Sequence, residues 1–421
     1  MTRHPILALV TAFVVLVSAG VAPVLAAADR AGIDSGFRTF LESDIWPAAR
    51  ARGVPRAVFD AAFAGVRPNL DLPDLVLPGE TAPVEETNFQ AEFQSPSAYF
   101  AESKIGPVVT RGRQMLARHR AVLEQIEAKT GVPASVIVAI WGRESGFGSA
   151  KIPYNAFEVL GTKAYLSRRK ETFREELLAA LTIVADGHLK VSEMRSSWAG
   201  ALGQPQFMPT KFLKLAVDFD GDGRRDIWQS VPDTLASIGQ YLAQSGWVRG
   251  RDWGFEANVP DRISCAQEGP DRRQSIREFV DAGVTRVSRR AFPAHEADQP
   301  GNLLMPAGRF GPAFVATPNF YVIKAYNNSD LYALFVGHAA DRIRGADAGF
   351  HGGWVANKGL TRGDVARMQK ILQGKGYDVG GADGLAGYKT RRSIGAWQEE
   401  NGQAATCWPT RDLFKKISQA G

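Results

Sequence analysis

ASVIVAIWGRESGFG, residues 134–148, is the stretch that decides the fold. Its first eight residues are almost wholly apolar, which is typical of a helix that is buried on most sides. Pro133 precedes it, where a proline is tolerated at a helix start. Gly146 and Gly148 supply the backbone conformations that end a helix. The pattern therefore places Glu144 at the end of a buried helix.

Glu144 has two interpretations at this position. A carboxyl group at the end of a buried helix is partly withdrawn from water, which raises its pKa because the charged form is disfavoured. A general acid needs this property near neutral pH. The alternative is a surface glutamate paired with Arg143, and the stretch alone favours that structural role.

A second stretch, SSWAGALGQPQFMP at residues 196–209, contains no charged residue. Its small residues would let a bulky ligand approach the backbone closely. Amide groups beside aromatic or thioether faces also suit sugar rings. A tight loop packed on the core is the weaker alternative, because its polar groups would need buried partners. The hydrogen-bonding groups are those of Ser197, Gln204 and Gln206, and the small residues are Ala199, Gly200 and Gly203.

GRESGFG, AGALGQPQFMP and KAYNNSDLYALFVGHAA, in this order, resemble the three signature blocks of the lytic murein transglycosylase B family. The blocks extend from Glu144 to His338, with weaker similarity from about Phe37. The resemblance implies a mainly α, lysozyme-like catalytic domain that cuts the MurNAc–GlcNAc β-1,4 bond of peptidoglycan without water. No cofactor is required for that chemistry. Glu144 would be the sole acid and base, and the product would end in 1,6-anhydroMurNAc.

The resemblance also implies substrate-binding residues. Ser197 and Gln206 would orient the substrate or the catalytic glutamate, and Tyr326 and Asn327 would line the cleft. The family has a glycine between the two polar positions of the second block, and Pro205 replaces it here. This departure stiffens the loop and affects the details of substrate contact.

Arg168 and Arg169 match a paired arginine of the family and would face carboxylates of the sugar or peptide. A solvated helix start explains the same pair equally well. The region from Ser196 to Val217 contains no acidic residue. Ordinary glycosidases use two carboxylates, whereas a reaction in which the substrate's own hydroxyl replaces water needs only one.

Two alternative functions remain open. A hydrolytic muramidase would use Glu144 with a water molecule, and a non-catalytic scaffold would only bind peptidoglycan. The 421 residues carry a formal net charge of +6, which suits several acidic polymers and decides nothing by itself. Nucleic-acid binding is not supported, because no basic stripe with interleaved aromatic residues is present.

DFDGDGRRD, residues 218–226, follows the spacing of an EF-hand-like calcium loop. Gln229 takes the place of the bidentate glutamate at the twelfth position, and a later aspartate is the candidate replacement. A structural Ca²⁺ and internal neutralisation by Arg224 and Arg225 both fit the loop. The candidate ligands are Asp218, Asp220, Asp222, Arg224 (through its carbonyl), Asp226 and Asp233.

Residues 1–28 have the features of a secretory signal: a basic start, the apolar run Ile6–Val17 and a small-residue cleavage site. The run is short for a membrane-spanning helix, although an uncleaved anchor is the lesser alternative. No cysteine lies here to carry a lipid anchor. We expect an exported, periplasmic protein that is monomeric and binds peptidoglycan glycan strands.

The rest of the chain divides into three parts. Residues 29–344 form the predicted catalytic domain, with a small β-containing insert at about 248–317 where short alternating runs are broken by Gly and Pro. Residues 345–359 form a Gly-rich linker. Residues 360–421 resemble a three-helix peptidoglycan-binding domain, in which Leu372, Ile394 and Trp397 would be core. Periodicity also predicts helices over 108–129 and 170–188.

Cys265 and Cys407 are the two cysteines of the chain and fall in different predicted parts. An oxidising compartment would allow a disulfide between them. Two free, buried thiols fit the sequence at least as well, so the pattern does not decide the pairing.

Overall fold

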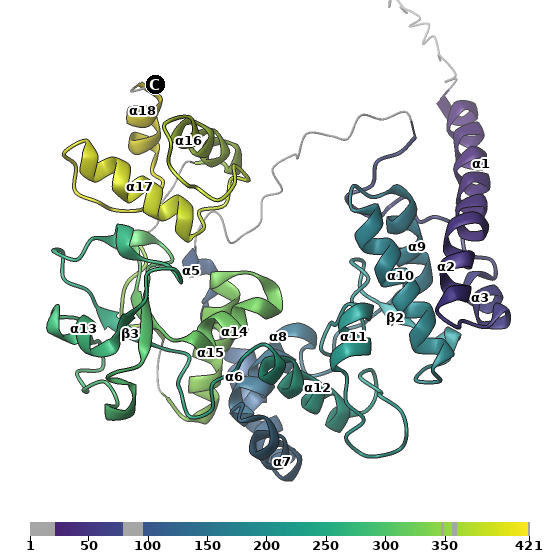
Figure 1. The fold of residues 1–421 in the computed structure, drawn as a ribbon, viewed down its shortest axis with the longest axis horizontal. Coiled ribbons are helices and arrows are strands. Elements are labelled where there is room, and N and C mark those ends of the chain that lie inside the picture. The colour runs from purple at the N-terminus through teal and green to yellow at the C-terminus, as the bar shows by residue number, and fades with distance from the viewer. Residues whose placement is uncertain (1–21, 79–95, 347–348, 356–359, 420–421) are drawn as a thin grey trace, which may run out of the picture.

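The computed structural model describes residues 22–78, 96–346, 349–355 and 360–419 (Figure 1). The fold is mainly α-helical with small sheets, as predicted. The first 21 residues of the predicted secretory signal, and so its apolar run, lie outside the described residues. Within the described part of the chain, no helix is both long enough and apolar enough to cross a membrane.

The N-terminal helices pack against a helical pair from the middle of the chain. α1 (Ala22–Phe40) continues through a π-helical turn (Leu41–Ile45) into α2 (Trp46–Ala51), and α3 (Arg56–Phe63) follows. These helices lie beside α9 (Ala156–Leu166) and α10 (Lys170–Ala185) in Figure 1. The buried aromatic rings of Phe37, Phe59 and Phe157 join the two groups into one core.

The central helices surround α8 (Ala134–Ser145), whose bounds match the predicted buried helix. The prediction of one helix over 108–129 was wrong, because the chain forms α6 (Glu102–Arg118) and α7 (Arg120–Thr130) instead. His119 leaves the helical conformation between them, and its ring packs against Trp141 of α8 at a centroid distance of 5.7 Å. Tertiary packing on α8 thus accompanies a break that the periodicity did not reveal. The remaining helices of this group are α5 (Pro96–Tyr99), α11 (Pro209–Leu215), α12 (Val231–Gln244), α14 (Pro318–Asn327) and α15 (Asp330–Arg344).

A five-stranded antiparallel sheet in the order β4-β6-β7-β3-β5 confirms the predicted β-containing insert. Its central pairing joins β3 to β7, with Phe255 opposite Val315. Phe255, Leu303 and Val315 are buried in a core separate from that of the helices. A short pair, β1 (Tyr154–Asn155) and β2 (Arg195–Ser196), lies near the second motif. The five strands are β3 (Gly254–Asn258), β4 (Gln274–Ser275), β5 (Thr285–Arg286), β6 (Pro300–Leu304) and β7 (Ala313–Ala316), with α13 (Ile276–Asp281) between β4 and β5.

The C-terminal module contains α16 (Arg362–Gly374), α17 (Tyr388–Glu400) and α18 (Arg411–Gln419), drawn in yellow-green to yellow in Figure 1. Leu372, Ile394 and Trp397 are buried in its core, as predicted. Gln369 is fully buried. Its side-chain amide donates hydrogen bonds to the Leu385 carbonyl and the Thr390 hydroxyl, and it accepts one from the Gly384 N–H. The buried polar side chains of Gln369 and Thr390 therefore help to hold the module together.

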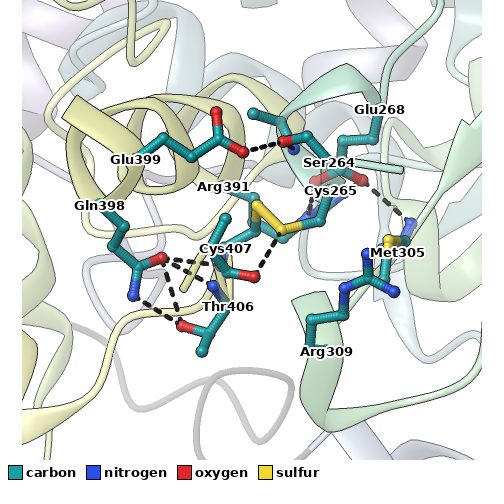
Figure 2. The surroundings of a disulfide bond; sticks show 12 residues. Ser264, Cys265, Glu268, Met305, Arg309, Arg391, Gln398, Glu399, Thr406 and Cys407 are labelled. Carbon is teal, nitrogen blue, oxygen red and sulfur yellow. Dashed lines mark hydrogen bonds and ion pairs between the residues drawn. A yellow bond between two sulfur atoms is a disulfide. The ribbon is translucent and has the colours of Figure 1, made fainter. Parts of the chain in front are cut away.

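Cys265 and Cys407 form a disulfide bond (Figure 2). The sequence left this pairing open, and it joins a loop of the insert to the segment between α17 and α18. Around it, the Ser264 hydroxyl donates to the Glu399 carboxylate at 2.5 Å, and the Gln398 amide holds Thr406. The module is therefore covalently attached to the insert.

Candidate active site

Glu144 lies in the last turn of α8, one residue before the helix ends. Gly146 stops the helix by adopting the left-handed conformation, with φ at 56°, that favours glycine. Helix residues 135–142 are all buried, whereas Glu144 is only half-buried. The carboxyl group is thus presented at the edge of a rigid, apolar helix.

Among the described residues, the Glu144 carboxylate has one direct side-chain hydrogen-bond partner, Tyr332 of α15. The Tyr332 hydroxyl donates a hydrogen bond to Glu144 Oε1 at 2.5 Å. Arg143 is turned away from the carboxylate, because its guanidinium donates to the Tyr99 hydroxyl and lies over the Tyr99 and Phe335 rings. The structure therefore does not show the surface pair between Arg143 and Glu144 that the sequence allowed.

Burial raises the pKa of Glu144 above its ordinary value. The hydrogen bond from Tyr332 and the positive charge of Arg143 act in the opposite direction without cancelling the effect of burial. Burial and the nearby Glu144 charge also raise the pKa of Tyr332 well above its usual range, so its hydroxyl stays a donor. This arrangement keeps a proton available on Glu144 at a higher pH than an exposed glutamate would.

Three tyrosines extend the site from Glu144 toward the second motif. The Tyr326 ring is nearly parallel to that of Tyr332, with centroids 6.2 Å apart, and it also packs against Tyr241 at 4.6 Å. The Tyr326 hydroxyl donates to the carbonyl of Pro205 at 2.8 Å. Tyr326, a predicted site residue, thus links the catalytic glutamate's surroundings to the loop that holds Gln206.

The loop at 196–209 is fixed to α8 through Gln204. Trp141 Nε1 donates to Gln204 Oε1 at 2.7 Å, and Gln204 Nε2 donates to the Trp228 carbonyl at 2.9 Å. Gln206 adopts a φ of 54°, and its amide donates to the Gly203 carbonyl. A tightly packed loop was the weaker interpretation because its polar groups would need buried partners. For Gln204 these partners are present.

The small residues of this loop serve the protein's own packing. A Cβ atom on Gly203 would lie 2.6 Å from the Ile227 carbonyl oxygen, and one on Gly200 would lie 2.4 Å from the Leu160 side chain. The packing of the protein itself therefore requires both glycines, and the approach of a ligand to their backbone stays a prediction. Ser197 is half-buried, and its hydroxyl accepts from the backbone of Ala199 and Ala201.

The paired arginines lie at the start of α10, beside the same loop. Arg168 and Arg169 are both exposed, and the Arg169 guanidinium is 5.2 Å from the Phe173 ring centroid. Lys163 Nζ lies between Phe173 and Trp198, at 5.2 and 5.3 Å from their centroids. Trp198 is 48% exposed, one of the few large apolar side chains so placed. An exposed tryptophan within a polar loop was a signal that the sequence analysis missed.

Asn327 is exposed at the end of α14, where Asn328 follows with a left-handed φ of 51°. Tyr332 lies in the same motif as Asn327, but it was not predicted from the sequence. Its apolar neighbours in α15 gave no sign that this side chain reaches a carboxylate 188 positions earlier in the chain.

The acidic loop after α11 brings three of the six predicted calcium ligands together. Carboxylate oxygens of Asp218, Asp220 and Asp222 lie within 4.8 Å of one another. Asp226 and Asp233 accept backbone N–H groups of the loop and of the following turn. Arg224 Nε and Arg225 Nη1 donate to the carbonyls of His188 and Leu213, so neither guanidinium is shown pairing with the loop's carboxylates.

Over the described ranges, no second carboxylate hydrogen-bonds Glu144 or shifts its pKa. A raised-pKa carboxyl group at the end of a buried helix, surrounded by tyrosines in a mainly helical domain, defines the class of lysozyme-like glycan-cleaving enzymes. The family described as Transglycosylase SLT domain matches residues 36–341, and a family of peptidoglycan-binding domains matches residues 361–417. The chain belongs to the SLT transglycosylase family.

Individual relatives agree with this assignment. Membrane-bound lytic murein transglycosylase B of Escherichia coli is 32% identical over 207 residues, which make up 49% of this chain and 55% of that relative. The chain thus matches only about half the length of this curated protein. The crystal structure of Pseudomonas aeruginosa SltB3 with NAG-anhNAM-pentapeptide is 38% identical, covers 91% of this chain and 99% of its own, and superposes with a TM-score of 0.81. E. coli Slt35 in complex with calcium shares the fold, with a TM-score of 0.52 and 21% identity over 75% of this chain and 92% of its own.

Proposed function

We propose that this protein is a lytic transglycosylase that cleaves the MurNAc–GlcNAc β-1,4 bond of peptidoglycan without water and remodels the cell wall. The observation that carries the proposal is Glu144, a single carboxyl group with a raised pKa at the edge of a buried helix. Family membership and the SltB3 complex with an anhydro muropeptide support the same chemistry.

The proposed reaction uses Glu144 twice. The protonated carboxyl gives its proton to the glycosidic oxygen while the bond from that oxygen to MurNAc C1 breaks. The resulting carboxylate then removes the proton of the MurNAc C6 hydroxyl as that oxygen bonds to C1. The second step forms the 1,6-anhydro ring and returns the proton to Glu144, so water is not consumed.

Tyr332 is suited to assist both steps. Its hydroxyl holds Glu144 Oε1 in one orientation and favours the carboxylate form that the second step needs. Tyr326, Gln206, Ser197 and Asn327 are proposed to orient the glycan. Arg168 and Arg169 are proposed to face the carboxylates of the glycan or its peptides. The exposed ring of Trp198 is proposed to stack on a sugar.

Mass analysis of purified sacculi digested by the wild-type protein and by Glu144→Gln tests the proposal. Products that end in 1,6-anhydroMurNAc are lighter by one water than hydrated ends. We expect only anhydro ends from the wild type and a loss of roughly 10³-fold in rate from Glu144→Gln. Hydrated ends would support the hydrolytic muramidase instead. Release of no product by either protein would support a non-catalytic scaffold, whose function Glu144→Gln would leave intact.

We further propose that residues 360–421 bind peptidoglycan and that the protein acts in the periplasm as a monomer. The domain limits at 28, 344 and 359 belong to the same proposal. The disulfide supports export, because such bonds persist in oxidising compartments. Cell fractionation tests the location, and the mass of the mature protein shows where its N-terminus lies. Sedimentation of the purified protein tests whether it is a monomer.

The Asp218–Asp222 loop is proposed to bind a structural Ca²⁺, which plays no part in the chemistry. Three carboxylates without a paired arginine repel one another unless a cation lies between them. The calcium complex of Slt35 has the same fold and supports the idea. We expect Ca²⁺ at a hundred times its Kd to stabilise the wild type by about 2.7 kcal/mol in thermal unfolding. Asp220→Asn should remove the effect, and an equal response of both proteins would contradict the site.

A further inference from the structure

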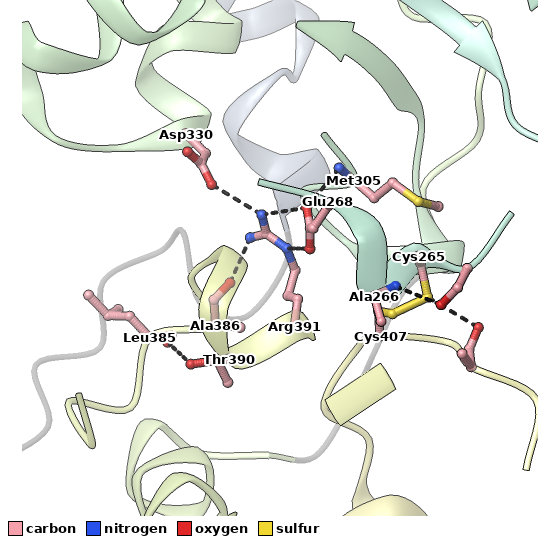
Figure 3. A network of polar contacts seen from close by, with 12 residues as sticks. Cys265, Ala266, Glu268, Met305, Asp330, Leu385, Ala386, Thr390, Arg391 and Cys407 are labelled. Atoms are coloured by element: carbon pink, nitrogen blue, oxygen red, sulfur yellow. Dashed lines mark hydrogen bonds and ion pairs between the residues drawn. A yellow bond between two sulfur atoms is a disulfide. The ribbon is translucent and has the colours of Figure 1, made fainter. Parts of the chain in front are cut away.

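The C-terminal module inserts a buried arginine into the interface with the rest of the protein. Arg391 of α17 is 3% exposed, and its guanidinium contacts groups from three segments (Figure 3). Nε and Nη2 donate to the two oxygens of Glu268 at 2.7 and 3.0 Å, and Nη1 donates to the Ala386 carbonyl at 2.7 Å. Nη2 also reaches Asp330 Oδ2 at 3.2 Å. Three of its four contacts lie outside the module.

Asp330 is the first residue of α15 and accepts a second cation from α14. Lys324 Nζ lies 2.8 Å from Asp330 Oδ1, so the carboxylate joins the two helices across the turn between them. Within that turn, Asn328 holds a left-handed conformation that asparagine tolerates at some cost. The charged contacts therefore add to the hydrogen bonds of the turn itself, in which the Asn328 N–H donates to the Lys324 carbonyl at 2.6 Å and the Ser329 side chain caps α15.

The same turn carries the tyrosines of the active site. Tyr326 follows Lys324 by two residues, and Tyr332 follows Asp330 by two residues. Tyr332 donates to Glu144 and Tyr326 donates to Pro205, each through a single hydroxyl. A shift of the turn would therefore move both hydroxyl groups relative to the reacting carboxyl.

The charges of this network balance only when Arg391 is present. Glu268 is fully buried and Asp330 nearly so. Lys324 pairs with Asp330, and its Nζ also lies 5.7 Å from the ring centroid of Tyr388 in the module. Without the guanidinium, the two carboxylates would repel each other, and the buried Glu268 would lose its charged partner. The turn would then lose one of the two cations that fix it.

We propose that Arg391 is a positioning residue by which the C-terminal module sets the α14–α15 turn, and with it Tyr326 and Tyr332, against Glu144. The module then contributes to bond cleavage itself as well as to attachment to the wall. This inference rests on the proposed transglycosylase function. Misplacing a catalytic partner by about 1 Å is enough to slow an enzyme by roughly 10²-fold, so a small movement of the turn would be measurable.

The test compares a short, soluble, peptide-free glycan of alternating GlcNAc and MurNAc with intact sacculi. Attachment to the wall cannot help the first substrate. For Arg391→Met we expect kcat on the soluble glycan to fall about tenfold and KM to change by a smaller factor, because the turn moves Tyr332 against Glu144 while Gln206, Ser197 and the paired arginines stay in place. Arg391→Lys keeps the charge without the fork and should restore part of the loss.

Arg392→Ala is the matched control. Arg392 is the next residue of α17 and also crosses the interface, but it pairs with Asp271, which is half-exposed in the insert. It should leave kcat on the soluble glycan unchanged. The proposal would be overturned if Arg391→Met kept the kcat of the wild type on the soluble glycan and digested only sacculi more slowly. The module would then serve only to attach the protein to the wall.

Asp330→Asn covers the case in which Arg391→Met does not fold, because it leaves the pair of Glu268 and Arg391 intact. We expect the same tenfold fall in kcat, and the double variant should be no slower than either single one, since both break one link. The proposed link from Arg391 through Asp330 to the turn would be refuted by an unchanged kcat for Asp330→Asn. It would also be refuted if the losses in kcat of the two single variants multiplied in the double variant.

The pH profile adds a readout that simple loss of stability would not produce. Glu144 faces the hydroxyls of Tyr332 and Tyr326, with Arg143 beside it. If the turn relaxes, Glu144 loses a donor that favours its charged form, so the alkaline limb of kcat/KM should move to higher pH in Arg391→Met. An unmoved limb would contradict the proposal. Failure of the proposed function would look different, because the wild type itself would then release no anhydro product.

Discussion

Glu144 and Glu268 are both glutamates withdrawn from water, and the protein treats them in opposite ways. Glu268 is fully buried and receives two hydrogen bonds from Arg391, whose positive charge opposes the effect of burial on the Glu268 pKa. Glu144 is half-buried and receives a neutral hydroxyl from Tyr332. Burial raises the pKa of both carboxyl groups. Glu268, however, is ion-paired with an arginine and holds two parts of the chain together, whereas the partner of Glu144 is an uncharged hydroxyl, which leaves Glu144 able to exchange a proton. The partner, more than the depth of burial, separates the structural carboxyl from the chemical one.

Glu268→Ala gives the largest expected effect in this comparison. It leaves Arg391 with only Asp330 as a charged partner in a buried interface, and should lower the free energy of unfolding by about 3–5 kcal/mol. Urea unfolding measures the loss, with Glu399→Ala, near the same interface but exposed, as the control. A loss below about 1 kcal/mol would mean that the pair contributes no more than a surface salt bridge.

Replacing Cys265 and Cys407 together by serine tests how much of the attachment is covalent. Removal of a native disulfide of this kind should cost about 2–4 kcal/mol. Because Arg391 remains, we expect the variant to stay active on the soluble glycan at temperatures where it is folded. Loss of that activity, in a folded variant, would show that the disulfide and not the arginine holds the turn.

Tyr332→Phe examines the partner of Glu144 itself. Loss of a hydrogen bond to a charged group should reduce kcat/KM about tenfold, equivalent to about 1.4 kcal/mol. The same change removes a donor that favours the carboxylate, so the Glu144 pKa should rise and the alkaline limb of the pH profile should move upward. A downward shift would show that Tyr332 supports the protonated form instead. Tyr377→Phe, in the C-terminal module, is the control.

The effect of Glu144→Gln on stability should be the smallest of these. It should be opposite in sign to the effect of Glu268→Ala on stability. A carboxyl group whose pKa is raised on folding destabilises the folded state once the pH exceeds its unfolded pKa. The variant should therefore melt slightly higher than the wild type at neutral pH, on the order of 1–2 °C, with no difference below about pH 4. Equal melting temperatures of the two proteins at every pH would mean that burial does not raise the pKa of Glu144.

The sequence predicted what depends on neighbouring residues. The buried helix and its glycine stop are local patterns, and they placed Glu144 at a helix end. The resemblance of three ordered motifs to a known family then identified it as the catalytic candidate. Tyr332, Arg391 and the disulfide depend on contacts across 188, 123 and 142 positions, which no local periodicity reports. The break at His119 likewise accompanies packing on Trp141. The small residues Gly200 and Gly203 were recognised as special, but the sequence did not show that Leu160 and Ile227 fill the space beside each missing Cβ.

The disulfide has a further consequence for a protein exposed to proteases. It closes the chain from residue 265 to residue 407 into a ring, and the ring includes α14, α15 and the stretch leading to α16. A single cut anywhere inside the ring, including at 345–359, would leave both fragments joined. The nicked protein would migrate as two pieces on a gel only after reduction, and under oxidising conditions it would keep its C-terminal module.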